Sequence, residues 1–196
     1  MTHTNPDSLP SGLHFLPEAQ LKLERIPSPG WILDIGGGGE GVIGQLEGCR
    51  VVAVDTSRRE LEEAAPGPLK LVMDARELQF LDGSFSAAAC FFSLMYIPPQ
   101  DHKKVLQEIY RVLQPGGQLY LWEANLPPRT ESSPELIAVK LTIQLPDREI
   151  QTGYGTRWPE QGLGPEHYQS RMSEVGFGEK KSWSGQGVFH LQARKP

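Results

Sequence analysis

Residues 31–41 have the sequence Trp-Ile-Leu-Asp-Ile-Gly-Gly-Gly-Gly-Glu-Gly. A short apolar run leads through Asp34 into five glycines within six positions, which predicts a buried strand followed by a tight turn. Val42, Ile43 and Leu46 then supply the apolar face of a short helix. Because glycine has no Cβ and accepts positive φ, its backbone can pass directly against a ligand. The stretch therefore predicts a strand–loop–helix cradle for a small molecule.

Four further apolar stretches predict strands, at residues 50–55, 69–73, 86–92 and 118–122. Residues 15–26 predict a short leading helix, with Pro17 in its first turn. The strongest helical pattern begins at Pro98 and ends at residues 115–117, Pro-Gly-Gly. Strand–helix units in succession form parallel sheets through right-handed crossovers. The fold class we expect is α/β, a doubly wound Rossmann-like sheet, mostly parallel, with helices on both faces.

The last third of the chain departs from this rhythm. Residues 136–145 and 148–154 have partly alternating patterns and predict a hairpin, although residues 137–141 also suit a helix. Residues 165–175 predict a helix that ends at Gly176. Residues 177–183 and 188–193 predict a closing antiparallel pair.

Composition limits the classes of function. The chain has 196 residues and a formal net charge of −5, and no apolar run approaches the ~18 residues of a membrane span. We therefore expect one cytoplasmic domain that binds neither nucleic acid nor membrane, with a loose polar tail at Met1–Pro10. Cys49 and Cys90 are expected to be free thiols, since one strand between them separates their backbones by ~10 Å, beyond disulfide reach.

Acidic residues follow three of the predicted strands directly. Asp34, Asp55 and Asp74 should meet at the carboxyl edge of the sheet, together with residues 92–96. A carboxylate at Asp55 can accept both hydroxyls of a ribose. Gly36, Gly38 and Gly41 also satisfy the G-x-G-x-x-G pattern of dinucleotide sites. However, an acid at Asp34 would oppose a pyrophosphate and favour a ligand with a cationic end.

In this combination the chain resembles the class I S-adenosylmethionine-dependent methyltransferases over residues 30–123. The similarity lies in Ile-Leu-Asp-Ile-Gly-Gly-Gly-Gly at 32–39, Val-Val-Ala-Val-Asp at 51–55, Asp74-Ala75, Phe-Leu-Asp-Gly-Ser-Phe at 80–85, Glu108 to Leu113 with Arg111, and Pro-Gly-Gly at 115–117. The chain departs from the family in two places. Glu40 stands where many members have a small residue, and Ser86 stands where they often have aspartate.

The resemblance implies S-adenosyl-L-methionine as cofactor and assigns roles within its site. Asp34 would face the methionine ammonium, Asp55 the ribose diol, and Asp74 the adenine N6, with the Ala75 amide at the ring. The full set of expected cofactor-binding residues is Asp34, Gly36, Gly37, Gly38, Asp55, Thr56, Asp74, Ala75, Phe92 and Ser93. The resemblance also implies seven strands, with residues 188–193 inserted antiparallel between the strand at 118–122 and the strand at 177–183.

The function we expect is in-line methyl transfer to a small-molecule acceptor without a metal. Positioning of the two reactants at ~3–3.5 Å can supply most of the rate. The candidates for a general base are Tyr96, Glu123, Tyr154 and His167, although His102 and His167 also suit solvated helix starts. Two alternatives remain open, a catalytically silent cofactor-binding protein and a nicotinamide-dependent oxidoreductase.

The predicted domain has three parts, a nucleotide-binding core at about 30–123, a cover or hairpin at 124–165, and a C-terminal helix with a strand pair at 165–194. Because the segment 124–165 leaves the sheet at its ligand-binding edge, we expect it to cover the cleft and to carry acceptor specificity. Tyr154, Arg157 and Trp158 would lie nearest the methyl group, with Gly153, Gly155, Gly162 and Gly164 as hinges. An edge hairpin that only shields apolar surface is the alternative.

Overall fold

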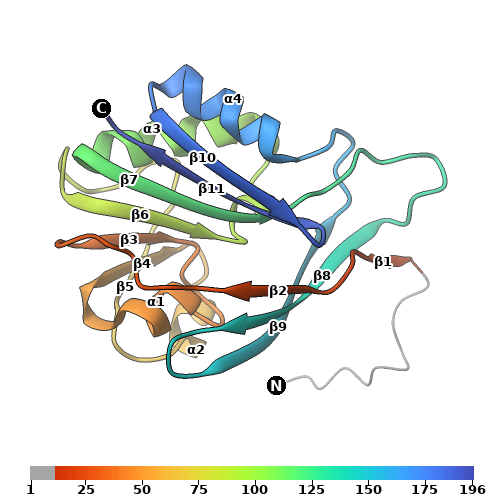
Figure 1. Cartoon of the computed structure of the whole chain (residues 1–196), viewed down its shortest axis with the longest axis horizontal. Coiled ribbons are helices and arrows are strands. Elements are labelled where there is room, and N and C mark those ends of the chain that lie inside the picture. Colours follow the sequence, from red (N-terminus) through yellow and green to blue (C-terminus); the bar gives the residue numbers. More distant parts are fainter. Residues whose placement is uncertain (1–11) are drawn as a thin grey trace.

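A computed structural model describes residues 12–196, so the predicted N-terminal tail lies outside the described residues. The elements in chain order are β1 (Leu13–Phe15), β2 (Ala19–Lys22), β3 (Ile32–Ile35), α1 (Val42–Glu47), η1 (Gly48–Arg50), β4 (Val51–Asp55), α2 (Arg58–Glu63), β5 (Leu69–Val72), β6 (Phe85–Phe91), η2 (Leu94–Tyr96), η3 (Pro99–Asp101), α3 (His102–Val112), β7 (Leu113–Ala124), β8 (Leu136–Gln144), β9 (Glu149–Arg157), α4 (Pro165–Val175), β10 (Gly178–Gly185) and β11 (Val188–Arg194). Figure 1 shows their arrangement.

The larger of two sheets has seven strands in the order β10-β11-β7-β6-β3-β4-β5. The pairs from β7 to β5 are parallel, and β11 is antiparallel to both β7 and β10. The predicted α/β class is thereby confirmed. The predicted antiparallel insertion of residues 188–193 between the strand at 118–122 and the strand at 177–183 is confirmed as well. In β6 the buried Ala87, Ala88 and Ala89 allow layers to pack closely on both faces of the sheet.

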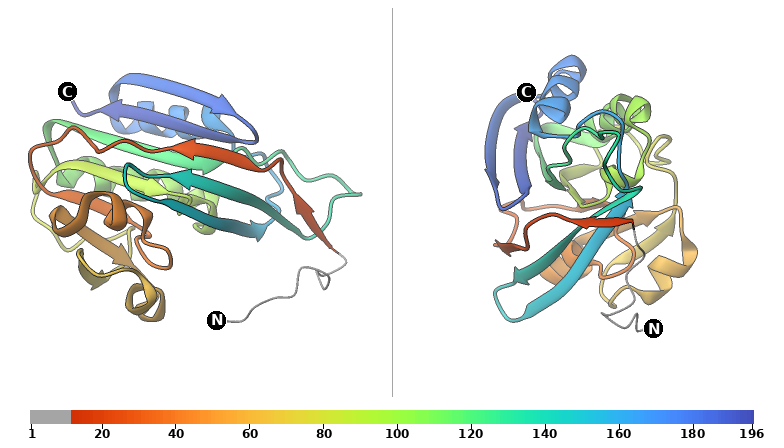
Figure 2. Two further views of the ribbon diagram at one scale, coloured as in Figure 1. Left: turned by 60° about the horizontal axis from the view of Figure 1, so that its bottom comes forward. Right: turned by 90° about the vertical axis from the view of Figure 1, so that its right-hand side faces the viewer.

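Helices lie on both faces of the large sheet, as expected (Figures 1 and 2). Helices α3 and α4 pack side by side on one face. On the other face lie α1 and, over the middle of the sheet, a smaller sheet (Figure 2, left). All these layers share one buried apolar cluster.

The smaller sheet consists of β1, β2, β8 and β9, with β8 paired to the other three. The predicted hairpin at 136–154 is confirmed by the antiparallel β8–β9 pair. The predicted leading helix at 15–26 is wrong, because these residues supply β2 and part of β1. Ala19, Leu21 and Leu23 are buried at every second position, which is the period of a strand and not of a helix. Parallel pairing with β8 then completes their backbone hydrogen bonds.

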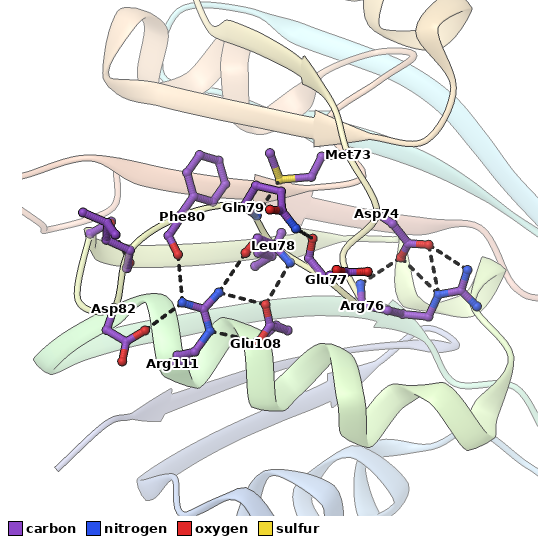
Figure 3. Close-up of polar contacts among 12 residues, drawn as sticks. Met73, Asp74, Arg76, Glu77, Leu78, Gln79, Phe80, Asp82, Glu108 and Arg111 are labelled. Carbon is purple, nitrogen blue, oxygen red and sulfur yellow. Dashed lines mark hydrogen bonds and ion pairs between the residues drawn. The ribbon is translucent and has the colours of Figure 1, made fainter.

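A cluster of polar contacts replaces a helix between β5 and β6 (Figure 3). The Arg111 guanidinium donates to the carbonyls of Leu78 and Phe80, at 2.8 Å each, and pairs with Asp82 and Glu108. Glu108 in turn accepts from the Leu78 amide at 2.8 Å. This arrangement gives a structural reason for the motif residues at 80–85 and at 108–113. It fixes the irregular segment that leads from β5 to β6.

Ser86, one of the two departures from the family pattern, has a structural role at the start of β6. Ser86 accepts a hydrogen bond from the Gly30 amide at 3.1 Å and contacts Ser28, so the serine still ties the start of β6 to the segment before β3.

Cys90 is buried in β6 and Cys49 is exposed before β4, and both are free thiols, as predicted. Within residues 12–196, no helix is both long enough and apolar enough to span a bilayer.

Candidate functional site

A cavity of about 600 Å³ lies at the carboxyl ends of β3, β4, β5 and β6. All ten predicted cofactor-binding residues line it, from Asp34 in β3 to Ser93 after β6. The parallel sheet accounts for this, because four strands that run in one direction present their following loops at one edge. The cavity is further lined by Glu40, Glu60, Arg76, Tyr96 and Tyr154.

The glycine loop follows β3 in a conformation that few other residues adopt. Gly36, Gly39 and Gly41 have φ of 73°, 59° and 56°, in the left-handed region. A Cβ at Gly38 would lie 2.6 Å from the Cβ of Glu60, so glycine is also needed for close packing on α2. The loop thus brings bare backbone to the cavity and at the same time holds α1 and α2 together.

Most of the loop's amides already have protein partners. Gly36 and Gly37 donate to the Val54 carbonyl, Gly39 donates to the Glu60 carbonyl, and Gly41 donates to Gly38. A dinucleotide loop instead directs its free amides at a pyrophosphate. The backbone here is therefore poorly suited to bind phosphate.

Asp34 and Asp55 lie on either side of this loop. Asp34 is buried, and burial, together with the nearby charge of Asp55, raises its pKa to about 7. One Asp55 oxygen accepts the Ser57 amide at 2.8 Å, while the Ser57 hydroxyl caps α2. This contact ties Asp55 to the start of α2, where Ser57 is the N-cap, and the other Asp55 oxygen remains directed toward Gly38.

Asp74 is held by a neighbour that the sequence interpretation did not include. Arg76 donates through its side chain and its amide to both Asp74 oxygens, and also bonds Asp101 at 2.9 Å (Figure 3 shows the Asp74 contacts). The Arg76 hydrogen bonds lower the pKa of Asp74. These contacts come from three N–H donors, because Arg76 Nε is shared between the two oxygens. A carboxylate has about four acceptor positions, so Asp74 keeps one for a further donor such as an exocyclic amine.

The charges of the residues that line the cavity favour one class of ligand over another. The cavity has five carboxylates, on Asp34, Glu40, Asp55, Glu60 and Asp74. Among the described residues that line it, Arg76 carries the one fixed positive charge, and two carboxylates already pair with it. This lining disfavours a pyrophosphate and suits a ligand with a net positive charge.

Sequence comparison identifies the domain. Residues 33–121 match the family described as "Methyltransferase domain". The match supports a class I S-adenosylmethionine-dependent methyltransferase domain in this part of the chain. The cofactor of such domains is S-adenosylmethionine. The carboxylates and the glycine loop of the cavity fit its cationic, sugar-bearing structure.

Curated relatives of this methyltransferase domain include two kinds of enzyme. The chain is 26% identical over 153 residues to a carboxy-S-adenosyl-L-methionine synthase of Photobacterium profundum, an alignment covering 71% of this chain and 62% of the relative. It is 34% identical over 120 residues to a demethylmenaquinone methyltransferase of Thermus thermophilus, covering 56% and 53%. The chain thus spans less than two thirds of each of these relatives.

Solved structures share the fold at low sequence identity. An S-adenosylmethionine-dependent methyltransferase from Mesorhizobium loti superposes with a TM-score of 0.61 and 15% identity, covering 86% of this chain and 93% of that structure. One from Methanosarcina mazei gives 0.58 and 16%, covering 87% and 94%.

The four candidate bases of the methyltransferase domain lie in different places. Tyr96 and Tyr154 line the cavity, whereas Glu123 and His167 are not among its lining residues. The Tyr154 ring stacks on Phe92, with centroids 5.1 Å apart and planes at 9°. Burial raises the pKa of Tyr154, and the nearby Glu40 and Tyr96 raise it further. Neutral Tyr154 is a hydrogen-bond donor and a ring surface, and it is a poor base at neutral pH.

Glu123 lies behind the cavity wall at the end of β7. Its Oε1 accepts the Leu94 amide at 2.6 Å, which holds the η2 segment against the sheet. Burial raises the pKa of Glu123 to about 8, although backbone donors at residues 93–95 act in the opposite direction. The carboxyl group is therefore mostly protonated at neutral pH. It positions the cavity wall and is a weak candidate for a base.

His102 and His167 lie within hydrogen-bond distance of each other, with His102 buried and His167 half-buried, so the expectation of a solvated His102 is wrong. His102 is fully buried, its Nε2 lies 2.9 Å from the Leu94 and Ile97 carbonyls, and its Nδ1 lies 2.9 Å from His167 Nε2. Packing of α4 against α3 buries His102, and Tyr168 stacks on its ring. Burial lowers the pKa of His167 to about 4. Through these two carbonyls His102 holds the η2 segment in place.

The predicted cover contributes one of its three named residues to the cavity. Tyr154 lines it, but Arg157 is exposed and pairs with Glu135, and Trp158 is buried where its indole donates to the Pro127 carbonyl at 2.8 Å. Gly153 and Gly155 lie inside β9 and pair with Lys140 and Ala138. They are part of a regular paired strand, and the hinge predicted at these glycines stays a prediction.

Glu40 is the cavity residue whose role the sequence interpretation missed. It was noted only as a departure from the family pattern, yet its Oε1 accepts a hydrogen bond from Thr152 Oγ1 at 2.5 Å. The signal available in the sequence was an ionisable side chain at a position of the glycine loop that usually carries none. Its partner in β9 lies 112 residues away and could not be found from local pattern.

Proposed function

We propose that this protein is an S-adenosylmethionine-dependent methyltransferase that acts on a small-molecule acceptor by in-line displacement. The proposal rests mainly on one observation, the acidic cavity beside a glycine loop whose amides are already used. That combination supports a cationic nucleoside ligand over a nicotinamide dinucleotide. The domain match supports the same choice.

Each carboxylate has a separate part in holding the cofactor. Asp34 pairs with the methionine ammonium, and Asp55 accepts from the ribose hydroxyls through the oxygen that Ser57 does not occupy. Asp74, fixed by Arg76, accepts from the adenine amino group. Phe92 and Ser93 form the wall of the cavity next to β6.

Methyl transfer requires little of the protein beyond positioning the cofactor and the acceptor. Bound S-adenosylmethionine supplies a methyl group on a positively charged sulfur, which is already a good leaving group. The protein holds the acceptor in line with the methyl–sulfur bond, and the smaller sheet with its Tyr154 ring excludes water from that side. None of the proposed steps needs a metal.

Calorimetric titration with S-adenosylhomocysteine and with NAD tests the cofactor assignment. We expect S-adenosylhomocysteine to bind, and Asp55→Ala to weaken it by tenfold to about a hundredfold, because hydrogen bonds to a charged group contribute ~1.5–3 kcal/mol each. Asp55→Asn keeps an acceptor for the Ser57 amide, so it separates the loss of ribose contacts from the loss of the turn.

Asp147→Ala is the matched control, since Asp147 lies in the exposed β8–β9 turn and pairs with Arg148. It should bind as the wild type does. Tighter binding of NAD, or equal affinity for S-adenosylhomocysteine in wild type and Asp55→Ala, would reject the proposal. Methyl incorporation from labelled cofactor into an acceptor distinguishes the enzyme from a silent binding protein.

A further inference from the structure

The order of the strands locates the part of the cavity that the cofactor leaves for an acceptor. The sheet edge runs from Asp74 after β5, past Asp55 and the glycine loop, to Phe92 after β6. On the proposed function, which this inference takes as its basis, adenine lies at the Asp74 end and the methionine part lies at the glycine loop. The acceptor then occupies the region beyond β6, under the smaller sheet.

Glu40 brings a carboxylate into that region. It extends from the glycine loop to β9, where the Thr152 hydroxyl donates to one of its oxygens at 2.5 Å. The cofactor roles assigned to Asp34, Asp55 and Asp74 do not use it. The carboxylate therefore keeps acceptor capacity toward a second ligand.

Aromatic rings lie beside this carboxylate. Tyr154 stacks on Phe92 and meets Phe91 edge to face at 6.2 Å between centroids, and the half-exposed Tyr96 also lines the cavity. A carboxylate next to ring faces is the arrangement that attracts an ammonium group, by charge pairing and by cation–π attraction.

An unused hydroxyl points independently to a polar ligand group in the same cavity. Ser93 is 7% exposed and lines the cavity, and its Oγ has no hydrogen-bond partner among the described residues. A buried hydroxyl without a partner is unfavourable, so a polar ligand group that pairs with it gains free energy. An ammonium group has three donors, so it can pair with the Glu40 carboxylate and keep donors for a further acceptor in the cavity.

We propose that the acceptor is a small amine whose ammonium group binds between the Glu40 carboxylate and the Tyr154 ring. For transfer, the ammonium gives one proton to the Glu40 carboxylate, and the freed nitrogen lone pair attacks the methyl carbon as the methyl–sulfur bond breaks, with S-adenosylhomocysteine as the leaving group. An anionic acceptor finds no free cation in this cavity, because the one guanidinium in its described lining is paired with Asp74 and Asp101. The neighbouring rings favour an aromatic or otherwise apolar body attached to the amine.

Three probes of similar size and different charge test the proposal on protein saturated with S-adenosylhomocysteine. They are 2-phenylethylamine, 2-phenylethanol and 3-phenylpropionate, titrated in separate NMR experiments. We expect the amine to bind at least about tenfold more tightly than the alcohol, which corresponds to ~1.4 kcal/mol, and the carboxylate to bind more weakly than the alcohol.

Glu40→Gln removes the charge and keeps an acceptor for Thr152, so it leaves the tie to β9 in place. It should weaken the amine about tenfold and change the affinity of the alcohol by less than twofold. Glu149→Gln, an exposed exchange of the same kind at the start of β9, should leave all three affinities unchanged. Tyr154→Leu gives a second test, since it removes the ring and should also weaken the amine selectively.

The outcomes separate this inference from the function on which it rests. If S-adenosylhomocysteine itself does not bind, the proposed function fails. If it binds but the amine shows no preference over the alcohol, or does not bind, only the inference fails. If Glu40→Gln weakens S-adenosylmethionine and spares S-adenosylhomocysteine, Glu40 serves the sulfonium charge and the amine proposal is wrong.

Discussion

The two sheets of this protein meet at one cavity but supply different kinds of residue to it. The large sheet contributes the glycine loop and the acids Asp34, Asp55 and Asp74, all at the carboxyl ends of parallel strands. The smaller sheet contributes Gly153 and Tyr154 from β9 and, through Thr152, fixes Glu40. The proposed cofactor-binding residues therefore belong to one sheet and follow from local sequence pattern. The proposed acceptor side depends instead on a contact between parts of the chain that are distant in sequence. The difference suggests that the two functions can be perturbed separately.

Substitutions in the two regions should differ most in their effect on the free energy of unfolding. Arg111→Ala removes donors from the Leu78 and Phe80 carbonyls and from two carboxylates, so we expect the free energy of unfolding to fall by about 2–4 kcal/mol. Arg157→Ala in β9 breaks one exposed ion pair at 3.6 Å. This variant should change the free energy of unfolding by less than about 0.5 kcal/mol. Urea denaturation measures both. Equal effects of the two substitutions would show that the polar contacts of Arg111 do not contribute the stability assigned to them.

A smaller effect should follow pH at the cofactor end. With its pKa raised to about 7, Asp34 is mostly protonated at pH 6 and mostly ionised at pH 8. Only the ionised form pairs with an ammonium, so S-adenosylhomocysteine should bind about tenfold more tightly at pH 8 than at pH 6. The same shift makes the ligand-free protein less stable as pH rises from about 4 to about 7. Asp34→Asn should bind with no such pH dependence, and a pH dependence retained in that variant would assign it to another group.

The smallest effect is expected in β9. Its residues pair with β8 along the whole strand, so we expect S-adenosylhomocysteine to change hydrogen exchange of residues 150–156 by less than about threefold. The glycine loop, which contacts the ligand, should gain much more protection. Strong ligand-dependent protection of β9 would instead show that the smaller sheet opens and closes as a cover.

The parts of this structure that the sequence predicted are those specified by neighbouring residues. The strand–glycine–helix unit at 31–47 and the acids after β3, β4 and β5 follow from local pattern and from the rule that parallel strands end at one edge. β2 was missed because Leu16, Leu21, Leu23 and Ile26 fit a helix, while the partner that makes it a strand lies in β8, about 120 positions later.

Tyr154 and Arg157 show how far the pattern in β9 could be used. Ile150, Thr152, Tyr154 and Thr156 alternate inward, which places Arg157 outward, and counting by two from Tyr154 would have predicted this. The burial of His102 depends instead on α4, which packs on α3. Such contacts between distant elements are not specified by any short stretch of sequence.

A crystal structure with S-adenosylhomocysteine bound tests the central claim most directly, namely that one cavity holds the cofactor on the large sheet and faces its sulfur toward the smaller one. We expect the ribose at Asp55, the adenine at Asp74 and Ala75, and the open side of the sulfur directed at Tyr154 and Glu40. A ligand bound outside this cavity, or one whose sulfur faces away from β9, would contradict the account.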